Sequence, residues 1–204
     1  MSFENAEAIV VYAQMKEADL SVPLYPEERF NEILRCKNDK TKQEKYQVWQ
    51  LLELAVKKYL NFDFANLQFT KTANGQWVCP DFYFSLSHTD GLVCVALARE
   101  PIGVDAELVR SINEGLSTRI LTPSELSYGN TLSSERRGEY LLECWVKKES
   151  IFKRSGTAAL MPGSIETSEH PASIKSVTVG AREYLISVCH GSAHKTEFKH
   201  MEDI

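Results

Sequence analysis

The chain has 204 residues, of which 43% are hydrophobic and 25% are charged, and it contains 10 glycines and 7 prolines. This composition is typical of globular proteins and excludes collagen-like, low-complexity and disordered chains. The 23 Lys and Arg residues against 28 Asp and Glu residues give a net charge of −5, which disfavours a nucleic-acid-binding protein held by phosphate contacts.

The cysteines and the apolar runs indicate where the protein works. Its 5 cysteines are widely spaced and include no Cys-x-x-Cys pair, as expected for reduced thiols in the cytoplasm. The short apolar run at residues 9–11 follows two glutamates and lacks the basic region and the length of a signal peptide. No segment approaches the roughly 18 apolar residues of a membrane span. We therefore expect a soluble, cytoplasmic protein that binds neither membranes nor nucleic acid.

Strand and helix signals alternate in the first half of the chain. β-branched and small apolar residues predict strands, apolar residues at helical spacing predict helices, and polar Gly-containing pairs predict turns. The expected elements are a strand at 8–15, helices at 26–36 and about 41–60, a turn at Asn74-Gly75, and a hairpin of strands 82–88 and 92–98 around the turn 89–91.

The second half of the chain also mixes strand and helix signals, but its sequence does not repeat that of the first half. Thr122 and Glu125 have the spacing of a helix-capping box. The expected elements are strand 102–108, a helix after Thr122, a long helix at 134–155, strands between 164 and 188, and a loose tail after about residue 191. We predict an α+β fold of two similar-sized lobes, residues 1–99 and 100–204, each a small, mainly antiparallel sheet packed on helices.

Two carboxylates in the predicted strand 102–108 form the first candidate site. Asp105 and Glu107 are two residues apart, so both side chains lie on one face of the strand. Paired carboxylate oxygens are what Mg²⁺ takes from a protein when phosphates and waters complete its octahedron. A solvated acidic strand face is the structural alternative.

The long helix carries the second candidate site. Lys148, Trp145, Glu149 and Lys153 fall within an arc of about 140° at 100° per residue. One face then presents a carboxylate between two ammonium groups, beside an indole. The alternative is an ordinary Glu-to-Lys pair on a wet surface, which does not account for the tryptophan.

Ser87 and His88 follow each other in a predicted strand, so their side chains lie on opposite faces. No G-x-S-x-G elbow surrounds the serine, and a hydrolase is therefore disfavoured. Phosphate binding and a structural, hydrogen-bonded histidine remain as alternatives. The chain also lacks the glycine-rich loops of the common nucleotide-binding folds.

Taken in order, these motifs resemble those of the 4′-phosphopantetheinyl transferases, in the long, single-chain Sfp-type branch. Residues 84–89 (FSLSHT) resemble the family's F-N-[IL]-S-H-S strand, 102–107 (IGVDAE) its [IV]-G-[IV]-D-x-E segment, and 145–153 its W-x-x-K-E-x-x-x-K helix. Between the last two, 121–126 are similar to F-[ST]-x-x-E-[LY]. The resemblance is strong over about residues 74–156 and implies a pseudo-dimeric fold of two lobes and a monomer.

The resemblance implies a reaction and a set of site residues. Coenzyme A would donate its 4′-phosphopantetheine arm to a serine of an apo acyl carrier protein or of a peptidyl or aryl carrier domain, releasing adenosine 3′,5′-bisphosphate. Asp105, Glu107 and Glu149 would bind Mg²⁺ or Mn²⁺, with Glu149 also a candidate base. Lys153 would contact phosphate where charge develops, and Lys148, His88 and Ser87 would contact coenzyme A.

The sequence departs from the family pattern at two turns. Gln76-Trp77 replaces the lysine and proline of a G-K-P turn, and Ala158 lies where the family has G-x-G-L. A basic residue near the start of the first long helix could be Lys42, by spacing from Asp39, or Lys45, by the apolar stripe. The alternative functions are a non-catalytic module that binds coenzyme A or a carrier protein, and a different Mg²⁺-dependent phosphotransferase.

Overall fold

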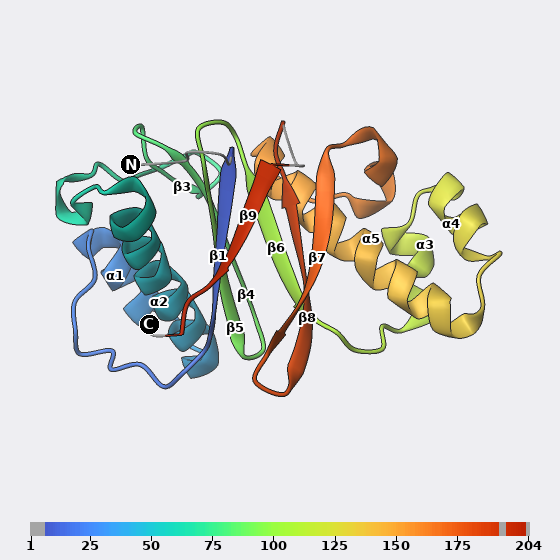
Figure 1. Ribbon diagram of the computed structural model, residues 1–204, viewed down its shortest axis with the longest axis horizontal. Helices are drawn as coiled ribbons and strands as arrows, with labels where there is room; N and C mark the ends of the chain where they lie inside the picture. The colour runs from blue at the N-terminus through green and yellow to red at the C-terminus, as the bar shows by residue number, and fades with distance from the viewer. Residues whose placement is uncertain (1–6, 192–194, 203–204) are drawn as a thin grey trace.

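A computed structural model describes residues 7–191 and 195–202, and it has a mixed α+β fold in which small sheets pack on helices (Figure 1). One sheet has the strand order β4-β5-β1-β9, a second has the order β6-β8-β7, and β2 and β3 form a separate hairpin. Within these described residues, no helix is long and apolar enough to cross a membrane.

The four-stranded sheet packs one face on helix α2. Its strands are β1 (Ala8–Gln14), β4 (Tyr83–Thr89), β5 (Leu92–Ala98) and β9 (Thr196–His200), and the neighbouring elements are α1 (Glu27–Leu34), α2 (Asp39–Ala55), the single-turn helices η1 (Val56–Leu60) and η2 (Phe64–Asn66), β2 (Thr70–Lys71) and β3 (Trp77–Val78). Alternate residues of β1 and β5 join apolar side chains of α2 in one core. This alternation is the two-residue period of a strand.

The three-stranded sheet packs on the long helix α5. This part of the chain contains β6 (Gly103–Leu108), η3 (Glu114–Leu116), α3 (Ser117–Ile120), α4 (Pro123–Gly129), α5 (Ser134–Ser155), η4 (Pro162–Ser164), η5 (Thr167–Glu169), β7 (Ala172–Val179) and β8 (Arg182–Cys189). The capping box of Thr122 and Glu125 is confirmed, as are the expected bounds of α5. Residues 162–164 and 167–169 form short helical turns, so the strands expected between 164 and 188 begin only at Ala172.

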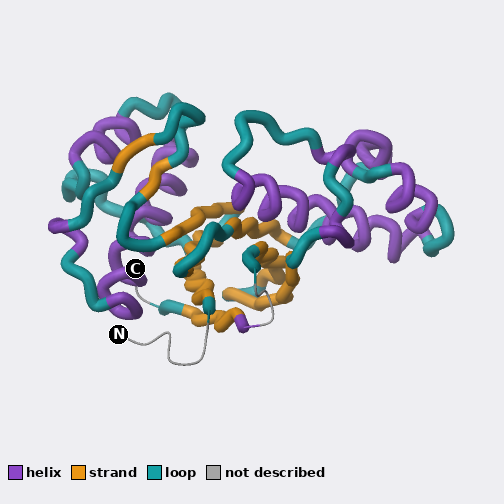
Figure 2. The backbone as a smooth tube through the Cα atoms, turned by 90° about the horizontal axis from the view of Figure 1, so that it is seen from above, coloured by secondary structure: helices purple, strands orange, loops and turns teal. Residues whose placement is uncertain are grey.

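The two sheets share a second core. The other face of β1 and β5 contributes small and aliphatic side chains, which meet Val104 and Ala106 of β6 and apolar residues of β7 and β8. Seen from above, the strands of both sheets surround one interior, and the helices lie outside them (Figure 2). Both faces of β1 and β5 are therefore buried, which explains their almost uninterrupted apolar sequence.

The expectation of a loose tail is wrong for residues 196–200. They form β9, which pairs in parallel with β1 from Ala8↔Thr196 to Tyr12↔His200. The remaining tail residues, 192–194 and 203–204, lie outside the described part of the chain. A parallel partner for β1 could not be read from the local pattern, because the short segment is polar and its partner is almost the whole chain away.

Gly103 allows the closest approach between β6 and α5. A Cβ atom there would lie 1.9 Å from the Ser150 carbonyl oxygen and 2.5 Å from the Arg154 nitrogen. Both obstacles are backbone atoms of α5, so they cannot rotate out of the way. β6 can therefore lie against this helix only with glycine at position 103.

We predict that Gly103→Ala lowers the free energy of unfolding by about 3 kcal/mol or more, because the added methyl group forces α5 away from β6. Urea denaturation measures the change. Gly138→Ala is the matched control: apart from its chain neighbours and the adjacent backbone of its own helix, no atom lies within 4 Å of its added Cβ. Alanine within a helix is expected to stabilise by about 0.5–1 kcal/mol. Equal stability of the two variants would contradict this account of Gly103.

Candidate active site at the seam between β4, β6 and α5

Serine side chains of β4 join the two sheets at their edges, and we call this junction of β4, β6 and α5 the seam. The Ser85 hydroxyl accepts a hydrogen bond from the Val104 backbone N–H at 3.0 Å, and the Ser87 hydroxyl accepts one from the Ala106 N–H at 3.1 Å. These N–H groups lie on the side of β6 that has no strand partner within its own sheet. Both serines are buried, so the hydroxyls satisfy backbone donors that water cannot reach.

Asp105 is held between Ser87 and Lys153. Its Oδ1 accepts hydrogen bonds from the Ser87 hydroxyl at 2.9 Å and from Lys153 Nζ at 2.7 Å. The carboxylate is only 6% exposed, and its Oδ2 has no hydrogen-bond partner. A buried carboxylate oxygen without a donor is unfavourable, and a bound cation would satisfy it.

Glu107 and Glu149 are less stable as anions than ordinary glutamates. Burial, and then the charge of Asp105, raises the pKa of each, although Trp145 lowers that of Glu107 and Lys153 lowers that of Glu149. The Trp145 indole N–H donates to Glu107 Oε1 at 3.0 Å. The three carboxylates thus affect one another electrostatically, as the sequence spacing suggested for Asp105 and Glu107. A cation placed among them would relieve this repulsion.

The carboxylates do not converge on a single point. Among residues 7–191 and 195–202, no three His, Cys, Asp or Glu side chains are grouped as a metal centre would need. Lys153 Nζ makes the ion pair with Asp105 at 2.7 Å. An ammonium group thus supplies the positive charge next to this carboxylate.

His88 lies on the side of β4 that faces helix α2. Its Nδ1 is 3.3 Å from Oε2 of the buried Glu44. Burial and then the positive charges of Lys153 and Lys45 lower the pKa of His88 to about 4. His88 is therefore a neutral imidazole near pH 7, next to basic side chains that a phosphate could use.

The structure distinguishes the two basic residues left open at the start of α2. Lys42 pairs with Asp39 of its own helix at 3.2 Å. Lys45 has its Nζ 3.6 Å from the Cys36 sulfur, and its charge acts on His88. Lys45 thus lies on the same side as His88, and Lys42 is engaged locally.

Two residues expected to contact coenzyme A are engaged by protein partners in this structure. Lys148 is completely buried, and its Nζ donates to the Ile120 carbonyl at 2.8 Å, the Pro162 carbonyl at 2.9 Å and Glu125 Oε2 at 2.5 Å. All three of its N–H groups are used, so none is left for a phosphate in this arrangement. The Ser87 hydroxyl is likewise occupied by Asp105, Lys153 and the Ala106 N–H, and through the first of these bonds it positions Asp105.

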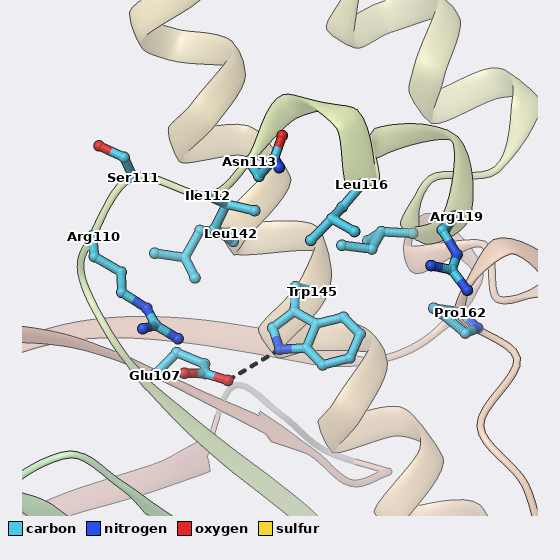
Figure 3. Close-up of a pocket in the computed structure, with 11 residues that line it drawn as sticks. Glu107, Arg110, Ser111, Ile112, Asn113, Leu116, Arg119, Leu142, Trp145 and Pro162 are labelled. Carbon is cyan, nitrogen blue, oxygen red and sulfur yellow. Dashed lines mark hydrogen bonds between the residues drawn. The ribbon is translucent and has the colours of Figure 1, made fainter.

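A cavity of about 520 Å³ opens next to Glu107 and Trp145 (Figure 3). Arg110 and Arg119 lie on either side of the indole in this view. Most of the other lining residues are apolar, namely Ile112, Leu116, Ile120, Leu142 and Pro162, with Ser111 and Asn113 at the polar side. Charged side chains therefore lie on both sides of the indole, Glu107 with Arg110 on one side and Arg119 on the other, and the body of the cavity is apolar.

Sequence reasoning missed Ser85, Glu44 and the cavity. Ser85, Ser87 and Thr89 alternate along β4, and a polar stripe of period two within a buried strand could have indicated a polar seam. Glu44 and the cavity depend on residues far apart in the chain, so no local pattern indicates them.

His88 gives a pH-dependent prediction. Because its pKa is about 4 in the folded protein and 6.5 is the ordinary value, the unfolded chain takes up a proton first as the pH falls. The free energy of unfolding should decrease between pH 6.5 and about 4. In His88→Asn this decrease should be smaller, as urea titrations at several pH values would measure. Superimposable pH profiles of the two proteins would contradict the buried, neutral histidine.

Comparisons with known proteins agree with the motifs at this seam. Residues 101–201, about half of the chain, match the model of the 4′-phosphopantetheinyl transferase superfamily. The 4′-phosphopantetheinyl transferase ffp of Bacillus subtilis is 26% identical over 157 residues, which cover 68% of this chain and 70% of the relative.

Two further relatives match over a shorter stretch. The 4′-phosphopantetheinyl transferase gsp of Aneurinibacillus migulanus is 28% identical over 54% of this chain and 48% of its own length. The 4′-phosphopantetheinyl transferase Sfp of Bacillus subtilis strain 168 is 24% identical over 55% of this chain and 51% of its own length. The matches thus span about half of these two relatives. The chain belongs to the 4′-phosphopantetheinyl transferase superfamily, alongside relatives of the Sfp type.

Proposed function

We propose that this protein transfers the 4′-phosphopantetheine group of coenzyme A to a serine of an apo acyl, peptidyl or aryl carrier protein. The observation that carries the proposal is the seam between β6 and α5. There Asp105, Glu107, Glu149 and Lys153 act on one another electrostatically, beside an apolar cavity. Phosphoryl transfer depends mainly on positioning and on charge stabilisation, which such residues supply.

The reaction forms one bond and breaks another. The serine Oγ attacks the phosphorus that carries the pantetheine arm, the bond from that phosphorus to the bridging oxygen breaks, and adenosine 3′,5′-bisphosphate leaves. Lys153 is partly exposed and can donate to the phosphate oxygens on which charge develops. Glu149 is the candidate acceptor for the serine proton, directly or through a water molecule.

The donor chemistry of the seam suits a divalent cation. Asp105 Oδ2 is buried without a donor, and the raised pKa values of Glu107 and Glu149 indicate carboxylates that gain from positive charge. Asp105, Glu107 and Glu149 are not grouped as a metal centre in this structure, so they would hold Mg²⁺ after their side chains turn toward one another. Mn²⁺ accepts the same oxygen ligands. When bound, the cation would neutralise charge on the pyrophosphate of coenzyme A.

His88 and Lys45 would receive the nucleotide part of coenzyme A. Both lie at the α2 side of the seam, and the charges of Lys45 and Lys153 act on His88. Coenzyme A would then extend from this basic region past Lys153, which brings the arm to the carboxylates. The cavity beside Trp145 would receive the serine-bearing segment of the carrier protein.

We further propose that the molecule consists of two pseudo-symmetric lobes, divided near residue 100, and works as a cytoplasmic monomer. Each lobe would contribute one sheet and its covering helix, with the active site at their seam. The division would not be a single cut in the sequence, because β9, near the C-terminal end of the described residues, pairs with β1 in the sheet of the first lobe.

Asp105→Ala should abolish transfer, because it removes a carboxylate that lies against Lys153 and next to both glutamates. The assay is mass spectrometry of an apo carrier protein incubated with coenzyme A and Mg²⁺. Mg²⁺ should also raise the Tm of the wild type but not of the variant. Asp39→Asn, whose side chain is 93% exposed, is the control and should remain active.

Two results would contradict the proposal at different points. Normal modification by Asp105→Ala would disprove the metal assignment. Binding of coenzyme A or carrier by the wild type, without transfer to any of a broad panel of carriers, would favour the non-catalytic binding module instead.

The carrier protein should dock with only a shallow dependence on salt, because the cavity is mainly apolar and its basic residues are Arg110 and Arg119. Carrier KM measured at increasing NaCl concentration tests this. Arg110→Gln/Arg119→Gln should flatten the dependence further, whereas Arg136→Gln on the exposed side of α5 should not. A steep dependence in the wild type would show that many more charged contacts bind the carrier.

A further inference from the structure

Lys148 is the least exposed charged residue described, and its surroundings account for its whole hydrogen-bonding capacity. Its side chain is 0% exposed, and the side chain of its partner Glu125 is 3% exposed. Besides Glu125, the ammonium group meets only backbone carbonyls, those of Ile120 and Pro162. A phosphate could reach this nitrogen only if these contacts broke and Glu125 were left as an unpaired buried anion, which is strongly unfavourable.

The contacts of Lys148 join segments that are not adjacent in sequence. Ile120 ends α3, Glu125 belongs to α4, and Pro162 begins η4. The other oxygen of Glu125 accepts from the Thr167 N–H at 3.0 Å and from its hydroxyl at 2.8 Å. The ammonium group of Lys148 therefore connects α5 to α3, α4 and Pro162, and its partner Glu125 extends the connection to Thr167.

Both residues whose carbonyls accept from Lys148 line the cavity next to the active site. Ile120 and Pro162 both line it, together with Trp145, which precedes Lys148 by one turn of α5 and binds Glu107. Lys148 thus fixes Ile120 and Pro162 of the cavity wall to α5, the same helix that positions Trp145 and Lys153 at the carboxylates.

We propose that Lys148 is a positioning residue for the acceptor: it sets the shape of the cavity that receives the serine-bearing segment of the carrier protein, and it does not contact coenzyme A. This inference rests on the proposed transferase function. Two neighbouring residues of α5 would then have different roles: Glu149 faces the reacting groups, and Lys148 faces the cavity wall formed by Ile120 and Pro162.

The test variant removes both charges, because Lys148→Met alone would leave Glu125 as an unpaired buried anion. In Lys148→Met/Glu125→Gln we expect the carrier KM to rise about tenfold or more, and the coenzyme A KM to change by less than about twofold. Lys147→Met, the adjacent lysine, is the matched control and should leave both constants unchanged.

A second measurement needs no transfer activity. Hydrogen–deuterium exchange should become faster in residues 112–121 and 160–167 of the paired variant, and it should stay unchanged in β1 and β5. Failure of the wild type to modify any carrier would argue against the proposed function, while this exchange pattern would still report on the wall.

Three results would overturn the inference. A rise in the coenzyme A KM with an unchanged carrier KM would make Lys148 a coenzyme A contact. Faster exchange with both KM values unchanged would leave it a purely structural residue. Unchanged exchange at the two wall segments would show that the ion pair does not hold them.

Discussion

One side chain, Ser87, both joins the two sheets and holds Asp105: its hydroxyl accepts from the Ala106 N–H and donates to the Asp105 carboxylate. β4 and β6 belong to different sheets, so their backbones cannot pair directly, and Ser85 and Ser87 satisfy the N–H groups of β6 instead. Because an unpaired buried N–H is costly, this junction has little freedom to slip. The oxygen that closes the sheet junction therefore also positions the central carboxylate of the site.

Helix α5 divides its polar residues between two sides. Close contact at Gly103 and the hydrogen bond between the Ser150 and Ser187 hydroxyls, at 2.8 Å, hold the helix on the three-stranded sheet. In this orientation Trp145 and Lys153 reach the carboxylates of β6. Lys148 turns toward α3 and α4. The positive charge available to a ligand at the seam is therefore smaller than a count of lysines on the helix suggests.

Local signals predicted the elements and the carboxylate pair well. The capping box at Thr122 depends on neighbours in sequence, and the shared face of Asp105 and Glu107 follows from strand geometry. The pairing of Lys148 with Glu125 could not be predicted, because an arc of about 140° on a helix includes residues that face different neighbours, and only the position of α4 shows which neighbour Lys148 meets. The partners of Ser87 could not be predicted either, since they come from β6 and α5, which are distant in sequence.

Strand β9 also affects the order in which the protein can assemble. It borders β1 but comprises residues 196–200, so it is synthesised long after its partner. During translation the outer edge of β1 stays open until nearly all of this sequence has left the ribosome. An open edge next to apolar strands can pair with other chains. Completion of the first sheet is therefore a late event, and a chain without residues 196–200 would leave the outer edge of β1 unpaired and available to other chains.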